Sequence, residues 1–317
     1  MAVLHDWRWH YPSPAAGSFV LRSVLAPLDG SELAKAALPV ARTLVQLTGA
    51  TLHVVYFGEP SLGPRKTLEQ LGLTPEQTRG SVLDQIAGPA CQAILRLAEE
   101  LPEPLIVIST QIQDQVVDES QTSTGEPKDG PEEEAKGVED TLSGLAHQIL
   151  RAAPERVVFV TPEPDRQPWQ IRRVVLAHDG TPSADAAIAP TADLAHLAGA
   201  EVIALHVAEG GSVHPSEPGS LSAPRYIDQP HHEWPAWAGE FLDRMLALGG
   251  SAEAINFQVL VTGGQPGSEI AQFARDHHAD LVILPWHGNW EEQPAGAVDV
   301  VIRRSGCPVL LHLNTKG

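Results

Sequence analysis

Short apolar runs alternate with stretches of helical periodicity along the second half of this chain. An apolar run at 171–177 precedes an Ala-rich stretch that ends at Gly199, and a further apolar run covers 201–207. Continuous apolar runs of this length are typical of strands buried on both faces, and strand, helix and strand within about 35 residues favour a parallel sheet. The same reasoning predicts strands at 257–261, 281–284 and 308–313 and helices at 266–277 and 296–304.

The first half shows the same order of elements. An apolar run at 20–28 precedes a helical pattern that ends at Gly49, and glycine is the residue that most often ends a helix. Further strands are predicted at 51–57, 82–86, 105–108 and 157–160, and helices at 89–101 and 144–152. The predicted fold class is α/β, with two tandem Rossmann-like domains that each hold a five-stranded parallel sheet flanked by helices.

The two halves also repeat in sequence. The segment VLAPLDGS at 24–31 returns as VVLAHDGT at 174–181, and the match continues without a gap to Gly49-Ala50 and Gly199-Ala200. A repeat of about 150 residues is the size of one domain. We therefore predict an N-terminal extension at 1–19, a first domain at 20–162, a Pro-rich linker at 163–169 and a second domain at 170–317.

Composition narrows the possible partners and the cellular compartment. The chain has 21 basic and 40 acidic residues, a net charge of -19, which argues against a nucleic acid or an anionic membrane as partner. The first 19 residues contain no continuous apolar run, so neither a signal peptide nor a membrane span is predicted there. The two cysteines, Cys91 and Cys307, lie in different copies, which favours a reducing compartment and a cytoplasmic location.

Two segments break the symmetry of the copies. Residues 113–140 hold ten carboxylates, two lysines and no aromatic residue. Such a composition does not bury enough apolar surface to offset the entropy of ordering, so we expect a mobile insertion. In the second copy, residues 210–235 are rich in Pro, Ser and His, and we expect an irregular excursion.

Five segments, taken in order, resemble the universal stress protein family. The resemblance implies a tandem of adenine-nucleotide alpha-hydrolase-like domains. It also implies that the last strands of the copies, near 157–160 and 309–313, meet across a pseudo-dimer interface within one chain. Whether two such chains pair again as a homodimer is left open. The segments are Ala26-Pro27-Leu28-Asp29-Gly30-Ser31, Thr48-Gly49-Ala50, Leu205-His206-Val207, Ala279-Asp280-Leu281-Val282-Ile283 and Gly306-Cys307-Pro308-Val309-Leu310.

The phosphate-binding motif of the resembled family is altered in both copies. ATP-binding relatives carry Gly-x-x-Gly, nine residues, then Gly-Ser or Gly-Thr after the fourth strand, where glycine amides approach the phosphates. Here the second copy has Gly288, then seven residues, then Gly296 and Ala297, so the spacing is shorter and the hydroxyl is missing. The first copy has Ser-Thr-Gln-Ile at 109–112. The resemblance therefore implies at most one weak adenine-nucleotide site, in the second copy.

The candidate contacts lie at the carboxyl ends of strands, where open parallel sheets bind ligands. Asp29 and Asp179 end the first strand of each copy, and the resemblance places this residue beside the adenosine; the alternative is an Asp that only caps the next helix. In the second copy Asp179, Gly288, Gly296 and Ala297 are the predicted contacts, with Val207 near the base. Mg²⁺ would enter only together with ATP or another adenine nucleotide.

A zinc site is the weaker alternative for the same region. His178, His206 and His287 are predicted near strand ends, and three histidines with an open position suit a hydrolytic metal. Adjacent strand residues point to opposite faces, however, so His178 and Asp179 do not both face one ion without a bend. No metal site is predicted from this set.

Three functions remain open at this point. The first is a non-catalytic stress-response module that binds a nucleotide weakly or binds a protein partner, since no P-loop or nucleophile elbow is present. The second is a slow ATP-hydrolysing switch in which His287 or Asp179 orients water. The third is a ligand-free scaffold whose acidic insertion recruits basic partners.

Overall fold

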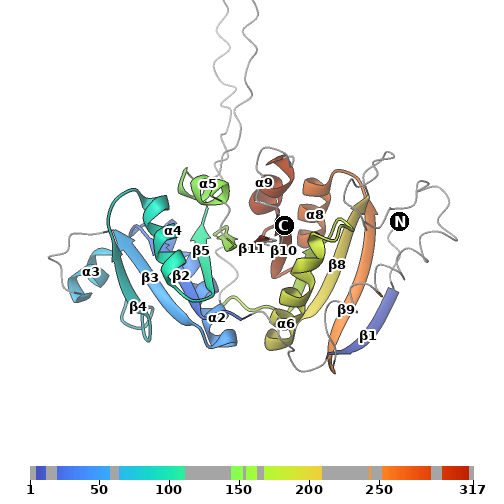
Figure 1. The fold of residues 1–317 in the computed structure, drawn as a ribbon, viewed down its shortest axis with the longest axis horizontal. Coiled ribbons are helices and arrows are strands. Elements are labelled where there is room, and N and C mark those ends of the chain that lie inside the picture. Colours follow the sequence, from blue (N-terminus) through green and yellow to red (C-terminus); the bar gives the residue numbers. More distant parts are fainter. Residues whose placement is uncertain are drawn as a thin grey trace, which may run out of the picture.

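A computed structural model describes residues 5–11, 20–57, 64–110, 144–152, 155–162, 168–208, 243, 252–286 and 295–313. Within these residues the strands form one continuous sheet of eleven, in the order β1-β9-β8-β7-β10-β11-β6-β5-β2-β3-β4 (Figure 1). The acidic segment 113–140 and the segment 210–235 lie outside the described residues.

The first lobe comprises strands β2 to β6 and their helices. Its strands run parallel in the order β4-β3-β2-β5-β6, so the order reverses between β2 and β5. The strands are β2 (Ser23–Leu28), β3 (Thr51–Phe57), β4 (Val82–Ile86), β5 (Pro104–Ser109) and β6 (Arg156–Val160), and the helices are α1 (Glu32–Lys35), α2 (Ala37–Thr48), α3 (Pro64–Gln70), α4 (Ala90–Glu100) and α5 (Gly144–Arg151).

The second lobe, β7 to β11, repeats this topology as β9-β8-β7-β10-β11. The equal strand orders confirm the tandem α/β fold. The strands are β7 (Arg173–Ala177), β8 (Glu201–Ala208), β9 (Ala252–Gly263), β10 (Leu281–Trp286) and β11 (Val309–Leu313), and the helical elements are the 3-10 turn η1 (Ala184–Ala187) and helices α6 (Ile188–Ala198), α8 (Pro266–Asp276) and α9 (Ala295–Arg304).

The N-terminal extension contains a strand that the sequence pattern did not predict. β1 (His5–Tyr11) pairs antiparallel with β9, with Trp7 opposite Phe257 and Trp9 opposite Ile255. This strand alternates aromatic with polar residues, the pattern of an edge strand, and lacks the apolar run by which the buried strands are recognised. The second half of the sheet therefore has a sixth strand, and the sheets of the two lobes are one.

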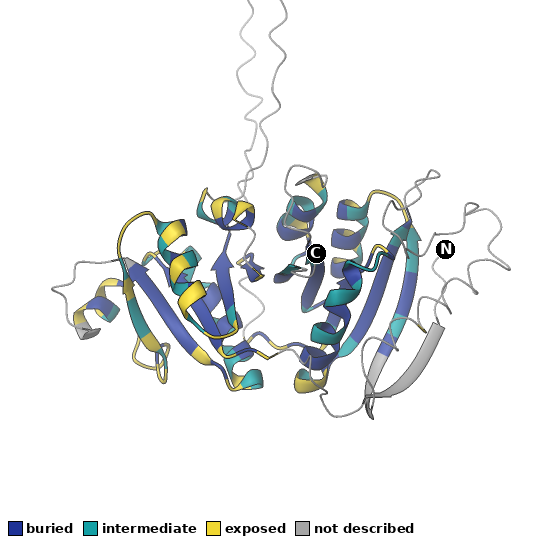
Figure 2. Ribbon diagram, in the orientation of Figure 1, coloured by how far each residue is buried: buried dark blue, intermediate teal, exposed yellow. Residues whose placement is uncertain are grey.

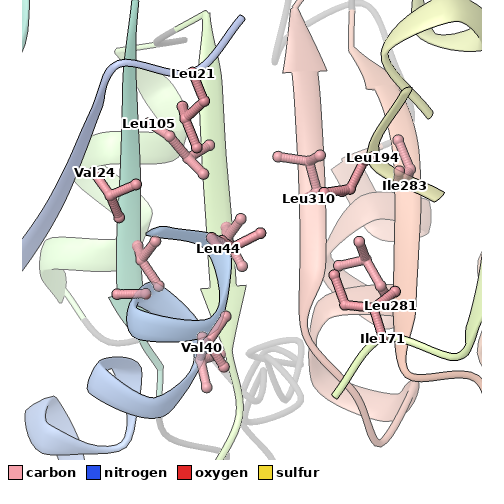
Figure 3. Packing of buried hydrophobic residues seen from close by; sticks show 14 of the residues in the cluster. Leu21, Val24, Val40, Leu44, Leu105, Ile171, Leu194, Leu281, Ile283 and Leu310 are labelled. Carbon is pink, nitrogen blue, oxygen red and sulfur yellow. The ribbon is translucent and has the colours of Figure 1, made fainter. Parts of the chain in front are cut away.

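Apolar side chains form a core on each face of the sheet. The central strands are buried (Figure 2). Alternate residues therefore enter opposite cores: Val24 lies on the face covered by α2 and α6, and Leu25 on the face covered by α4, α5, α8 and α9. Each core continues from one lobe into the other. Figure 3 shows one face, where Leu105 and Leu44 of the first lobe and Leu310 and Ile283 of the second belong to one cluster.

The lobes join through the last strand of each. β6 and β11 pair antiparallel, and Val158 lies opposite Leu310. Val158 lies beside Val107 of β5, and Leu310 lies beside Ile283 of β10. Since Val107 and Ile283 correspond to each other in the two lobes, Val158 and Leu310 hold equivalent positions. The register is therefore self-complementary, as in a two-fold dimer interface. This pairing is the intramolecular pseudo-dimer that the resemblance implied.

The predicted linker ends inside the core. Trp169 is buried, its indole Nε1 donates to the carbonyl of Asp280 at 3.0 Å, and its own carbonyl accepts from Thr43 Oγ1 at 3.0 Å. On the opposite side of the junction Thr161 Oγ1 donates to the carbonyl of Ile302 at 3.1 Å. Trp169 is thus hydrogen-bonded to residues of both lobes.

We predict that Leu310→Ala lowers the free energy of unfolding by about 2–5 kcal/mol, because the leucine is buried at the junction and its loss leaves a cavity. Urea denaturation followed by circular dichroism measures the change. Leu197→Ala is the matched control, since that leucine is 46% exposed and its removal costs within about 0.5 kcal/mol. Equal costs for the two variants would contradict a packed junction.

A histidine at the junction makes stability depend on pH. Burial lowers the pKa of His312 from 6.5 to about 4, and the charge of Arg156 acts in the same direction, against Glu155. Its Nδ1 is buried and has no hydrogen-bond partner among the described residues. The unfolded chain therefore takes up this proton more readily than the folded chain between pH 6.5 and 4.

We predict that the free energy of unfolding falls as the pH is lowered from 6.5 toward 4, and that His312→Leu reduces this slope by up to about 1.4 kcal/mol per pH unit. Urea denaturation at a series of pH values gives both slopes. An unchanged slope in the variant would show that His312 is not held neutral by the fold.

Candidate functional site

The turn after the first strand has the same geometry in both copies. Asp179 Oδ1 accepts from the backbone N–H of Thr181 at 2.9 Å and from its hydroxyl at 2.6 Å. Asp29 Oδ1 accepts from the N–H and hydroxyl of Ser31 at the same two distances. The intervening residues have positive φ angles, 87° at Gly30 and 85° at Gly180. This backbone conformation favours glycine. Both aspartates therefore hold the turn, whereas the N-cap of α1 is Ser31, whose side chain accepts from the N–H of Ala34.

A buried histidine distinguishes the second copy. His178 accepts from the N–H of Gly180 at Nδ1, 3.0 Å away, and its Nε2 lies 3.2 Å from Asp185 Oδ1. Because Nδ1 is an acceptor here, the ring proton is on Nε2, toward the carboxylate. The first copy has Leu28 and Lys35 at the equivalent positions, and its Asp turn forms without the pair. The histidine and aspartate are thus an addition to a turn that does not need them.

His206 extends the network from β7 to β8. Its Nδ1 hydrogen-bonds to the carbonyl oxygen of His178 at 2.9 Å, so Nδ1–H is the donor. Burial lowers the pKa of His206. The bond to the His178 carbonyl and the charge of Asp179 oppose that shift, while the His178 ring adds to it. His206 therefore favours its uncharged form and links the ends of two neighbouring strands.

A pocket opens beside this network at the carboxyl ends of β7, β8 and β10. It is a hollow of about 170 Å³, and the first turns of α8 and α9 form its opposite wall. This is the crevice where parallel sheets of this topology bind ligands, since strand order reverses there. Its lining comprises Ala177, His178, Asp179, Leu205, Val207, Pro266, Ile270, Leu284, Pro285, Ala297, Val298 and Val301.

The structure brings three of the predicted contacts together. Asp179, Val207 and Ala297 line the pocket, whereas Gly296 is exposed in the first turn of α9 and is not part of the lining. Asp29 lies in the other lobe. Gly288 falls outside the described residues, as does His287, which the zinc alternative included and the hydrolysis alternative named alongside Asp179.

Several lining residues were not foreseen. His178 was considered only as a metal ligand, although it forms part of the pocket wall, where it accepts from the Gly180 amide and lies against Asp185. Pro266 is the first residue of α8, and a proline at that position is a recognisable start of a helix. That signal could have placed α8 at the crevice. Within the described residues no group of three or more His, Cys, Asp or Glu side chains could hold a metal ion.

The first lobe differs at the corresponding crevice. The residues after α3 approach the Asp29 turn, and a β-carbon added at Gly30 would lie 3.8 Å from the Leu71 side chain. Leu71 is buried there. Ser109 and Thr110, which stand in place of the motif glycines, are buried at the end of β5, and their hydroxyls have no hydrogen-bond partner among the described residues. The Asp29 turn is thus preserved while its surroundings have changed.

The second lobe matches a known family over its whole length. The model of the Universal stress protein family matches residues 170–312, which span β7 to β11 and the pocket. The second lobe of this chain belongs to the universal stress protein family. Together with the shared strand order, this confirms the resemblance that the five sequence segments indicated.

Solved structures extend the likeness to both lobes. A functionally unknown protein from Pseudomonas aeruginosa PAO1 is 17% identical, with a TM-score of 0.61 over 93% of this chain and 94% of its own. A universal stress protein from Archaeoglobus fulgidus DSM 4304 is 15% identical, with a TM-score of 0.59 over 95% of this chain and 99% of its own. At these identities the likeness concerns the fold. No curated protein matches the sequence.

One further observation concerns membranes. No helix among the described residues is long and apolar enough to cross a bilayer. The helices of this universal stress protein domain instead place their apolar sides on the two cores.

We predict that the His178–Asp185 pair is coupled. Asp185→Ala alone should destabilise the protein by about 1–3 kcal/mol, because the buried imidazole loses the carboxylate that lies 3.2 Å from its Nε2. His178→Leu installs the residue of the first copy, and the double variant should cost less than the sum of the single variants. A double-mutant cycle by urea denaturation measures the coupling, and strictly additive costs would show that the two side chains do not interact.

Proposed function

We propose that this chain is a non-catalytic stress-response binding module with one weak adenine-nucleotide site, in the second lobe. The observation that carries the proposal is the pocket at the strand-order reversal, where Asp179, Val207 and Ala297 converge. Small-molecule sites are mostly apolar with a few placed polar groups, and this pocket has that character. The membership of this lobe in the universal stress protein family supports the same assignment.

The geometry of the described residues favours binding over catalysis. Both nitrogens of His178 face groups of the protein itself, the Gly180 amide and the Asp185 carboxylate. A general base needs a free acceptor within reach of the proton that it removes. Asp179 has one oxygen committed to Thr181 and is exposed, so its second oxygen suits a hydrogen bond to a ligand better than proton transfer.

The proposed setting and partners follow from composition. A cytoplasmic location agrees with two buried cysteines that are not joined in a disulfide. The net charge of -19 disfavours nucleic acid and anionic membranes and suits a basic protein partner. The domain limits 20–162 and 170–317, with a linker between them, are part of the same proposal, and a homodimer of tandem chains stays a further possibility.

Calorimetry with ATP, ADP and AMP tests the proposal. We expect dissociation constants in the micromolar range or weaker, because the altered glycine motif offers few amides to the phosphates. Nanomolar affinity, or no binding of any adenine compound, would contradict it.

Phosphate release distinguishes the switch alternative. We expect no ATP hydrolysis above the background of a mock-purified sample, and the same result for Asp179→Asn. Hydrolysis that Asp179→Asn abolishes would support the switch. The scaffold alternative would be favoured by a partner that binds at low salt and is lost when residues 113–140 are deleted.

A further inference from the structure

The described lining of the pocket in the second lobe is apolar and acidic. Of the twelve described residues that line it, ten are apolar and the other two are His178 and Asp179. No Lys or Arg is among these twelve. Sites that hold several phosphates neutralise them with cations or with converging backbone amides. In this pocket the described charge is the carboxylate of Asp179.

Backbone donors are also scarce at the pocket. Pro266 and Pro285 line it and have no N–H. The amide of Gly180, in the turn that follows β7, donates to His178 Nδ1 at 3.0 Å. The buried His178–Asp185 pair holds that acceptor in place.

A second carboxylate lies over the first turn of α8. Glu269 Oε2 accepts from the hydroxyl of Thr262 at 3.3 Å, and a β-carbon added at Gly264 would lie 2.8 Å from Oε1. An acidic side chain is favoured near a helix N-terminus for the reason that a phosphate is. Glu269 thus supplies, from the protein, the negative charge that an anionic ligand would otherwise bring.

We infer that this pocket selects the uncharged nucleoside part of an adenine compound and that every added phosphate weakens binding. The inference rests on the proposed function and names the ligand class for its site. The exposed Asp179 carboxylate accepts a hydrogen bond from a ribose hydroxyl or an exocyclic amine, and the apolar walls contact the ring. Phosphates meet the carboxylate of Asp179 in the lining and the field of Glu269, which lies outside the lining in the first turn of α8.

Calorimetry with adenosine, AMP and ATP in EDTA, at low salt, tests the order of affinities. We expect adenosine to bind most tightly, with a loss of about two- to threefold for each added charge. Raising the salt concentration should strengthen ATP binding, because salt screens the repulsion between the phosphates and the carboxylates. A site that binds phosphates through positive charge would instead lose affinity as salt is added. ATP binding tighter than adenosine, or weakened by salt, would overturn the inference and leave the proposed function standing.

Variants with matched controls locate the effect. Asp179→Asn should weaken adenosine binding about tenfold, because a charged acceptor is lost, and Asp29→Asn, which alters the same turn in the first lobe, should leave it unchanged. Glu269→Gln should improve ATP binding about two- to threefold without affecting adenosine, and Asp276→Asn, at the far end of α8, should change neither.

The outcomes separate the two claims. If no adenine compound binds, the inference and the proposed function both fail. If ATP binds in preference to adenosine, only the inference fails. An equal loss of adenosine binding in Asp29→Asn and Asp179→Asn would show that the contact is not in the second-lobe pocket, which also contradicts the inference.

Discussion

The antiparallel pairing of β6 with β11 is the interaction on which the architecture depends. It converts two parallel sheets of equal topology into one sheet and lets the core on each face run through both lobes. Val158 and Leu310 meet at equivalent positions, so the contact is self-complementary, as it would be between two identical chains. Tethering the halves removes the entropy cost of bringing them together and allows each copy to change independently.

The copies have used that freedom differently. The Asp turn keeps its hydrogen-bond lengths in both, which shows that the turn satisfies a requirement of the backbone. Around it, the second copy acquired a buried His–Asp pair and keeps a pocket, whereas in the first copy Leu71 lies against the turn. A preserved turn is therefore weak evidence for a preserved ligand. The side chains that surround it carry the functional difference.

The sequence predicted the buried strands well, because strands covered on both faces are read as apolar runs. The prediction was less complete at the edge of the sheet in the second lobe. There β9 extends over Ala252–Gly263 although only 257–261 was predicted, and β1 was not predicted. Of the candidate site, the position of Asp179 followed from the strand end, but its neighbours did not. His178 and Asp185 meet only because the turn and η1 bring them together, and pairing at that distance is invisible to a periodicity argument.

The β1–β9 pairing joins two segments that lie far apart in the sequence. Trp7 lies opposite Phe257, so 250 residues separate two segments that share a ladder. During synthesis β1 has no partner until β9, which ends at Gly263, has been made, whereas β2 and β3 can pair once Phe57 has been made. Contacts of such high sequence separation form slowly. The outermost strand of the finished sheet is thus the first to be made and among the last to be placed.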